Sequence, residues 1–210
     1  MALDLTVLPF ELEEPDIPVG FYGMREEWLG TMRQYGMTGL SGGPNIRFKD
    51  FGPRGVPRLD FDETDRYLDA AANAGYALPI LSYGGPANLE DVGYENAEEV
   101  FAAWGKPAGL AALDAAKRIL GEMRRHAVQR HRPVCTFNMC DEPRVRENTE
   151  RIVASVKFLK RAAPELRIAG SYSVDFRTNN DPLALQTLFR TMDASILNDH
   201  DEAVMAEGRR

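Results

Sequence analysis

A chain of 210 residues, of which 44% are hydrophobic and 27% charged, is long enough to bury a core as one soluble domain. The net charge of -7 argues against a nucleic-acid or anionic-membrane surface, because phosphate binding needs clustered Lys and Arg. No apolar run has transmembrane length, and residues 1–18 lack the basic start and long apolar core of a secretory signal. As it stands, the chain is expected in the cytoplasm, and export of a parent protein stays open.

The first half of the chain alternates between short apolar strands and longer helices. After an extended lead-in over 1–16, the predicted elements are a strand at 17–23, a helix at 24–36, a strand at 38–43, a helix at 62–75 and a strand at 77–85. A Pro- and Gly-rich loop with Arg47, Lys49 and Arg54 precedes the second helix. We expect Asp62 to cap this helix and Gly75 to end it.

The second half continues the alternation after an irregular stretch at 86–107, which contains a short helix, ENAEEVFAAW. An insertion of this length in a compact domain is commonly functional. The next predicted elements are a helix at 109–131, a strand at 133–143, a helix at 147–164, a strand at 167–174, a helix at 181–192 and a strand at 193–200. The last residues, DEAVMAEGRR, are typical of the start of a further helix. The basic residues at 124–132 are interpreted as a solvated helix end.

Strands that alternate with helices of a dozen or more residues indicate an α/β fold with a parallel sheet. Two architectures fit, a doubly wound open sheet and a (β/α)8 barrel of the TIM type. No GxGxxG loop follows the first strand, and most strands end in polar or aromatic residues, which favours the barrel. These strand ends are Tyr22, Ser41, Tyr83, Glu142, Ser173 and Asp199. About six βα units are visible within 17–210, so the barrel is incomplete, or an oligomer partner or flanking domain closes it.

The stretch TFNMCDEPR, at 136–144, is an apolar strand that ends in two acids and a proline. In a regular strand, one face carries Thr136, Asn138, Cys140 and Glu142, and the other carries Cys135, Phe137, Met139 and Asp141. The polar set is expected inside the barrel, with Glu142 at the mouth and Asn138 one layer deeper. Asp141 joins Glu142 only if the strand breaks, which Pro143 favours.

Two neighbouring carboxylates at a strand end allow one of them to stay protonated as a general acid beside a permanent anion. The alternative interpretation is an ordinary polar turn before a helix that includes Glu147. The position after a central parallel strand favours the catalytic interpretation.

The strand end FNMCDEP resembles the Asp-Glu-Pro strand end of family 123 glycoside hydrolases and their uncharacterised relatives. The lead-in LPFELEEPDIPVGFYG is similar to the segment that joins their β-sandwich to their barrel, and MRQYGMTGL and LDAAANAGY are similar to their first two helix-to-strand passages. The resemblance implies hydrolysis of a β-linked N-acetylhexosaminide, in which Glu142 protonates the leaving oxygen. Asp141 would orient the 2-acetamido group, which itself attacks the anomeric carbon. The family's last two strands and its β-sandwich have no counterpart in these residues.

Other candidates for carbohydrate contacts are aromatic and polar side chains near strand ends. Tyr22, Tyr83 and Tyr172 are candidates to stack on sugar faces, and Trp104 is a candidate platform on a lid. Asn198 and Asp199 are candidates to bind sugar hydroxyls. Ordinary packing is the alternative for each of them.

Metal and covalent chemistry have weaker support in the sequence. Asp199, His200 and Asp201 are consecutive, so a strand would point them to opposite faces, and no Cys/His spacing indicates zinc. Cys135 and Cys140 would lie roughly 16 Å apart on a strand that rises about 3.3 Å per residue, too far for a disulfide. Neither cysteine has an evident histidine partner. We therefore predict no metal and no cofactor.

Two functions stay open. The first is a glycoside hydrolase of carbohydrate metabolism, with Glu142 as general acid/base and Asp141 as its partner. The second is a non-catalytic carbohydrate-binding or structural barrel domain of a larger glycosidase-like protein. Both predict a carbohydrate partner, and neither predicts binding to nucleic acid or to a membrane. Turnover of aryl glycosides discriminates between them.

Overall fold

The computed structural model describes residues 24–41, 46–76, 80–82, 89, 92–94, 96–132, 135–141, 143, 145–172 and 181–197. The strand expected at 17–23 and the helix expected after residue 200 lie outside these residues. Within them, helices and strands alternate along the chain, which confirms an α/β fold.

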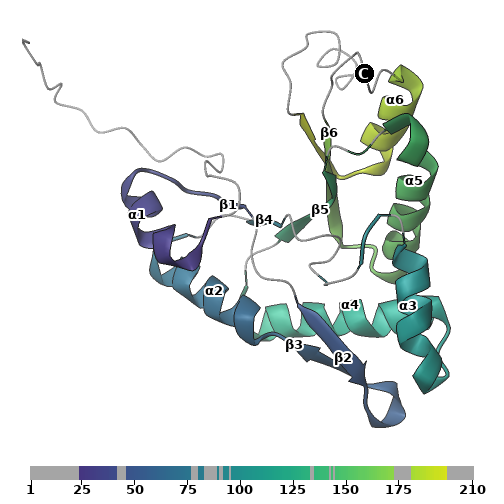
Figure 1. Ribbon diagram of the computed structural model, residues 1–210. Helices are drawn as coiled ribbons and strands as arrows, with labels where there is room; N and C mark the ends of the chain where they lie inside the picture. Colours follow the sequence, from purple (N-terminus) through teal and green to yellow (C-terminus); the bar gives the residue numbers. More distant parts are fainter. Residues whose placement is uncertain are drawn as a thin grey trace, which may run out of the picture.

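The main sheet has parallel strands in the order β1 (Leu40–Ser41), β4 (Ile80–Ser82), β5 (Cys135–Asp141), β6 (Arg167–Tyr172) and β7 (Ala194–Leu197). This spatial order follows the order along the chain, without the reversal that marks a doubly wound sheet. Right-handed crossovers then place the connecting helices on one face, and Figure 1 shows the helices in an arc on one side of the strands. Among the described residues, β1 and β7 remain edges, and no closed barrel is formed.

The helices of the described residues match the predicted segments closely. They are α1 (Leu29–Gln34), α2 (Asp62–Asn73), α3 (Ala97–Gly105), α4 (Ala112–Gln129), α5 (Val145–Ala162) and α6 (Pro182–Thr191), with 3-10 turns at Glu26–Trp28, Pro53–Gly55 and Lys106–Ala108. Gly75 follows α2 with a φ of 90°, as expected for a helix stop. The prediction that Asp62 caps α2 is wrong. Asp62 is the first helical residue, and its backbone N–H donates to Asp60 Oδ1 at 3.1 Å.

The segment predicted as a Pro- and Gly-rich loop forms an antiparallel hairpin of β2 (Arg47–Phe51) and β3 (Pro57–Asp60). A register shift after Phe48 brings its ring close to that of Phe51, with centroids 5.1 Å apart. The Phe48 ring also stacks on Trp104 of α3 at 4.7 Å. The basic residues of this segment are exposed, and Lys49 pairs with Asp60 at 3.0 Å. The hairpin is therefore held to α3 by aromatic contacts that the loop interpretation did not anticipate.

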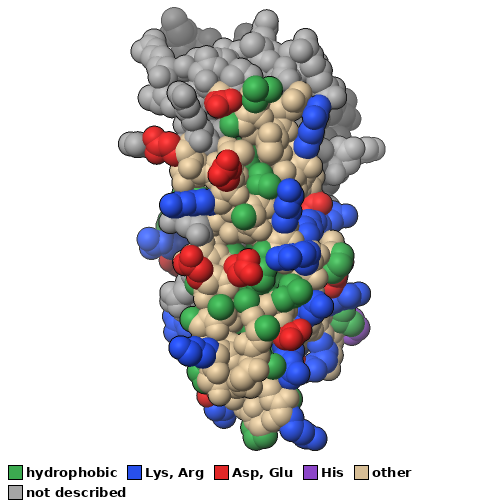
Figure 2. Space-filling view, turned by 90° about the vertical axis from the view of Figure 1, so that its right-hand side faces the viewer, with side chains coloured by type: hydrophobic (Ala, Val, Ile, Leu, Met, Phe, Trp, Pro, Cys, Tyr) green, Lys and Arg blue, Asp and Glu red, His purple; other side chains and the backbone are tan. Residues whose placement is uncertain are grey.

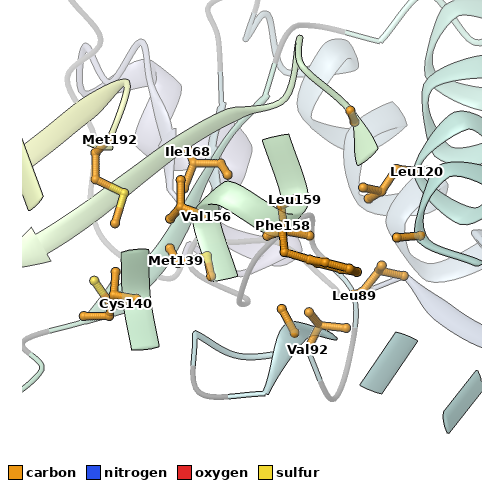
Figure 3. Close-up of a cluster of buried hydrophobic side chains, with 14 of the residues drawn as sticks. Leu89, Val92, Leu120, Met139, Cys140, Val156, Phe158, Leu159, Ile168 and Met192 are labelled. Atoms are coloured by element: carbon orange, nitrogen blue, oxygen red, sulfur yellow. The ribbon is translucent and has the colours of Figure 1, made fainter. Parts of the chain in front are cut away.

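The larger hydrophobic core lies between the sheet and helices α3 to α6. Figure 3 shows part of it, where Met139 and Ile168 from the strands lie beside Val156 of α5, and the Phe158 ring of α5 points toward Leu89. Its most deeply buried side chains include Phe101, Ile119, Ile152, Val156, Phe158, Leu159, Ile168 and Leu188. Each such burial stabilises the fold by roughly 1.5–3 kcal/mol relative to exposure. Leu89, from the irregular stretch before α3, belongs to this core with 1% exposure, so that stretch contributes to folding.

A smaller core joins α1, α2 and β1. The Tyr67 hydroxyl donates to the Met24 carbonyl at 3.0 Å, and the Tyr76 hydroxyl donates to the Leu29 carbonyl at 3.2 Å. Burial raises the pKa of Tyr67 to about 12, so this phenol stays a neutral donor at physiological pH.

The outer face of the helices is a mixed charged surface. Figure 2 shows Lys and Arg interspersed with Asp and Glu on the side that faces right in Figure 1. Arg124, for example, pairs with Glu165 at 2.8 Å, with both side chains largely exposed. No helix in the described part of the chain is long and apolar enough to cross a membrane.

Candidate functional site

The register between β5 and β6 decides which face carries the candidate acids. Asn138 is paired with Ala169, and Asp141 is paired with Ser171. Between these two pairs the chain advances three residues along β5 but only two along β6, which is a β-bulge. Partners in register lie on the same face of a sheet, so Asp141 shares a face with Asn138 and Ser171.

The bulge corrects the face assignment from strict alternation, which put Asp141 with Met139 and placed Cys140 with Asn138. Met139 and Cys140 are instead both buried in the larger core, at 2% and 4% exposure. Asp141 reaches the polar face because the bulge adds one residue, inside the strand and before Pro143.

The face of β5 and β6 that packs on the helices is apolar and closely filled. Ile168 and Tyr172 are 0% exposed, and the Tyr172 ring makes an edge contact with Phe189 of α6 at 5.8 Å. A Cβ atom at Gly170 would meet both the Tyr172 hydroxyl and the Cys140 sulfur. Glycine is thus required here by close approach.

This packing removes Tyr172 from the set of sugar-stacking candidates. Its ring lies in the core on the helix side, because the strand turns Ile168, Gly170 and Tyr172 to one face and Ala169 and Ser171 to the other. Trp104 is likewise not a free platform. One side of its indole stacks on Phe48, and Phe101 meets it edge-on at 5.4 Å. Both aromatic residues stabilise packing in this structure.

The opposite face of β5 and β6 is polar. Asn138 Nδ2 donates to Ser171 Oγ at 3.0 Å, and the two residues are 3% and 0% exposed. The other end of the amide, Asn138 Oδ1, is buried and has no hydrogen-bond partner in the described part of the chain. Asp141 is exposed at the end of β5. An amide oxygen, a hydroxyl and a carboxylate thus lie in one column on two adjacent strands.

The remaining predicted site residues lie outside the described residues. They are Glu142, Tyr22, Tyr83, Asn198 and Asp199. Ser171 was not among the predicted site residues, although it alternates in phase with Arg167 and Ser173 along the predicted strand, a pattern that indicates a polar face.

A second polar cluster joins α2 to the end of α4. Asp65 accepts hydrogen bonds from His126 Nε2 at 2.9 Å and from Arg132 Nη2 at 2.9 Å. Asp69 accepts from Arg132 Nη1 at 2.6 Å and from Arg130 Nη2 at 2.9 Å. We call these five residues the Asp65 junction. The Arg132 side chain is only 8% exposed, so the interpretation of residues 124–132 as a solvated helix end is wrong for this residue.

The electrostatics of the Asp65 junction follow from these contacts. Burial raises the pKa of Asp65, but hydrogen bonds from His126 and Arg132 outweigh that effect and leave it below its usual value. The hydrogen bond from Arg132 is the main cause that lowers the pKa of Asp69. The His126 ring also stacks on Phe61 at 3.8 Å between centroids. Because each carboxylate is engaged by protein cations, the junction is a structural connection between two helices.

Metal and thiol chemistry gain no residues from the described part of the chain, where no group of three or more His, Cys, Asp or Glu could hold a metal ion. Cys140 is a free thiol, and burial raises its pKa to about 12. A thiol with that pKa is protonated at physiological pH and is a poor nucleophile.

Comparisons with known proteins give no further identification: no family model matches the chain, and no curated protein matches it.

Proposed function

We propose that this protein is a glycoside hydrolase of the (β/α)8 type that acts on a β-linked N-acetylhexosaminide. Glu142 serves as general acid and base, and Asp141 orients and stabilises the 2-acetamido group of the substrate. That group attacks the anomeric carbon from within the substrate, so the enzyme needs no second carboxylate on a distant strand. The proposal follows the resemblance of the FNMCDEP strand end to family 123 glycoside hydrolases.

The observation that carries the proposal is the bulge in β5. It turns Asp141 toward the face of Asn138 and Ser171 and away from the helices. Bulges commonly lie next to active sites, where they re-aim a side chain. A polar turn without function would not need this geometry, because an exposed Asp at the end of a regular strand is equally well solvated.

The sheet topology supports the same proposal. Sequential parallel strands with helices on one face are the arrangement from which a (β/α)8 barrel is built, and barrel enzymes place their chemistry at the C-terminal strand ends. Asp141 ends β5, the middle strand of the five. The open edges at β1 and β7 among the described residues favour one alternative, a carbohydrate-binding barrel domain without turnover.

The test is hydrolysis of two aryl β-N-acetylgalactosaminides, one with a 4-nitrophenyl and one with a phenyl leaving group, by wild type, Glu142→Gln, Asp141→Asn and the control Glu147→Gln. We expect Glu142→Gln to lower kcat at least about 100-fold on the phenyl substrate, the scale of general acid catalysis. The loss should be smaller on the 4-nitrophenyl substrate, whose leaving group needs less protonation. Glu147→Gln should match wild type.

An aryl β-glucoside, which lacks the acetamido group, tests the substrate-assisted mechanism. We expect no turnover of this substrate by any of the four proteins. Wild-type rates equal to those of Glu142→Gln on every substrate would reject the enzyme. Sugar binding with no turnover would support the carbohydrate-binding alternative.

A further inference from the structure

On the Asp141 face, among the residues that the structure describes, only Asn138 has a buried side-chain atom without a hydrogen-bond partner. Three buried side-chain atoms in the described residues lack a partner: Arg132 Nε, Tyr172 Oη and Asn138 Oδ1. Arg132 uses its two other nitrogens on Asp65 and Asp69, and Tyr172 Oη lies in the apolar core. Asn138 Oδ1 alone belongs to the face that carries a candidate catalytic acid.

A buried acceptor without a donor is unfavourable, and such groups in native proteins call for a specific explanation. Only one end of this amide has a structural role: Nδ2 joins β5 to β6 by donating a hydrogen bond to Ser171 Oγ at 3.0 Å. That hydrogen bond holds the amide between the two strands, and Oδ1 is the end without a donor. A buried acceptor without a donor in the protein is the kind of group that orients a ligand in a binding site.

The position of Asn138 relative to Asp141 indicates which part of a ligand it would contact. Because of the bulge, Asn138 and Asp141 are separated along the sheet by the length of two residues of β6, which is about 7 Å at 3.3 Å per residue. Asn138 lies on the N-terminal side, farther from the strand ends. A sugar whose reacting end lies at Asp141, with its leaving group outside the strand ends, therefore extends its opposite end toward Asn138.

We infer that Asn138 is a specificity-determining residue, whose Oδ1 accepts a hydrogen bond from the sugar hydroxyl at C4, opposite the anomeric carbon. The inference rests on the proposed function, since that function places the anomeric carbon near Asp141. A carbonyl oxygen only accepts, so it selects a hydroxyl in one orientation. C4 epimers of the same sugar present that hydroxyl differently, and Asn138 distinguishes them.

The experiment measures the dissociation constants of N-acetylgalactosamine and N-acetylglucosamine, which are C4 epimers, by isothermal titration calorimetry. The proteins are wild type, Asn138→Leu, which replaces the amide with an apolar group of similar size, and Asn73→Leu, the same change at an exposed position on α2. We expect wild type and Asn73→Leu to prefer one epimer by about 10-fold or more, since a site built to hydrogen-bond a hydroxyl discriminates against the epimer whose hydroxyl cannot make that bond. Asn138→Leu should bind both epimers within about 2-fold of each other.

The urea midpoint of Asn138→Leu separates a specificity role from a structural one. We expect a midpoint close to that of wild type, because the variant loses one hydrogen bond to Ser171 and also loses an unpaired buried oxygen. A lowered midpoint together with an unchanged epimer ratio would show that Asn138 only stabilises the sheet. An unchanged ratio or equal wild-type affinities would overturn the inference and leave the proposed function standing. No binding of either sugar by wild type would overturn both.

Discussion

The Asp65 junction and the polar face of β5 and β6 treat partly buried polar groups in opposite ways. At the junction, two carboxylates are shared among two arginines and a histidine. On the strands, Asn138 has one end bonded to Ser171 and one end without a partner among the described residues. At the junction both carboxylates are engaged and Arg132 lacks a partner only at Nε, whereas the Asn138 amide is unpaired at its whole acceptor end. The junction maintains the fold, and the unpaired amide oxygen is the basis for the inference that the strand face binds a ligand.

The largest expected effect comes from removing the central cation of the junction. Arg132→Leu removes the most buried cation of the junction and leaves Asp65 and Asp69 with the more exposed Arg130 as their shared partner. We expect the free energy of unfolding to fall by about 3 kcal/mol, the lower end of the range for breaking a buried ion pair. Urea denaturation measures the change. Arg124→Leu is the control, since its exposed pair with Glu165 should contribute less than about 1 kcal/mol. Equal losses in the two variants would contradict the structural role of the junction.

A smaller loss is expected when the packed side of the strand pair is disturbed. Gly170→Ala inserts a methyl group against the Tyr172 hydroxyl and Cys140 sulfur, and overpacking of this kind costs roughly 1–3 kcal/mol. Gly121→Ala is a matched control in α4, where a Cβ meets nothing within 4 Å. This control should gain about 0.5–1 kcal/mol from better helix propensity. If Gly170→Ala is as stable as wild type, the close packing behind the polar face is not rigid.

The smallest expected effect is the pH dependence of the junction. The pKa values of Asp65 and Asp69 lie below the usual 3.8 in the folded state, so each carboxylate binds fewer protons folded than unfolded. Their stabilising contribution is therefore full above about pH 5 and decreases as the pH falls through the folded pKa values. Urea midpoints between pH 7 and pH 3 should fall less steeply for Asp69→Asn than for wild type. Parallel curves would show that Asp69 does not contribute.

Sequence patterns predict the helices and the alternation of this fold well. The stops at Gly36 and Gly75 and the apolar periodicity of α4 and α5 are local properties, which a single sequence carries. The hairpin of β2 and β3 was not predicted because the segment is rich in Pro and Gly, which is typical of a loop. Phe48 and Phe51 are three residues apart, which is not strand alternation, and a register shift between Phe48 and Asp50 accompanies the contact of their rings.

The candidate site was only partly predictable for the same reason. The motif at the end of β5 identified Asp141, and alternation correctly placed Asn138 away from the core. Alternation failed at Cys140, because a bulge depends on pairing with the neighbouring strand and leaves no mark in one sequence. Asp65 and Arg132 are 67 residues apart in the sequence, so a local pattern could not predict their hydrogen bond.

The bulge in β5 also matters for any protein that is compared with this one. It adds one residue to the strand, so the odd–even rule that puts Met139 on the helix side does not put Asp141 there. A related strand without the bulge could carry the same motif and still turn its aspartate to the opposite face of the sheet. Roles should therefore be transferred between such strands by pairing register, with Ser171 as the reference point, and not by counting along the motif.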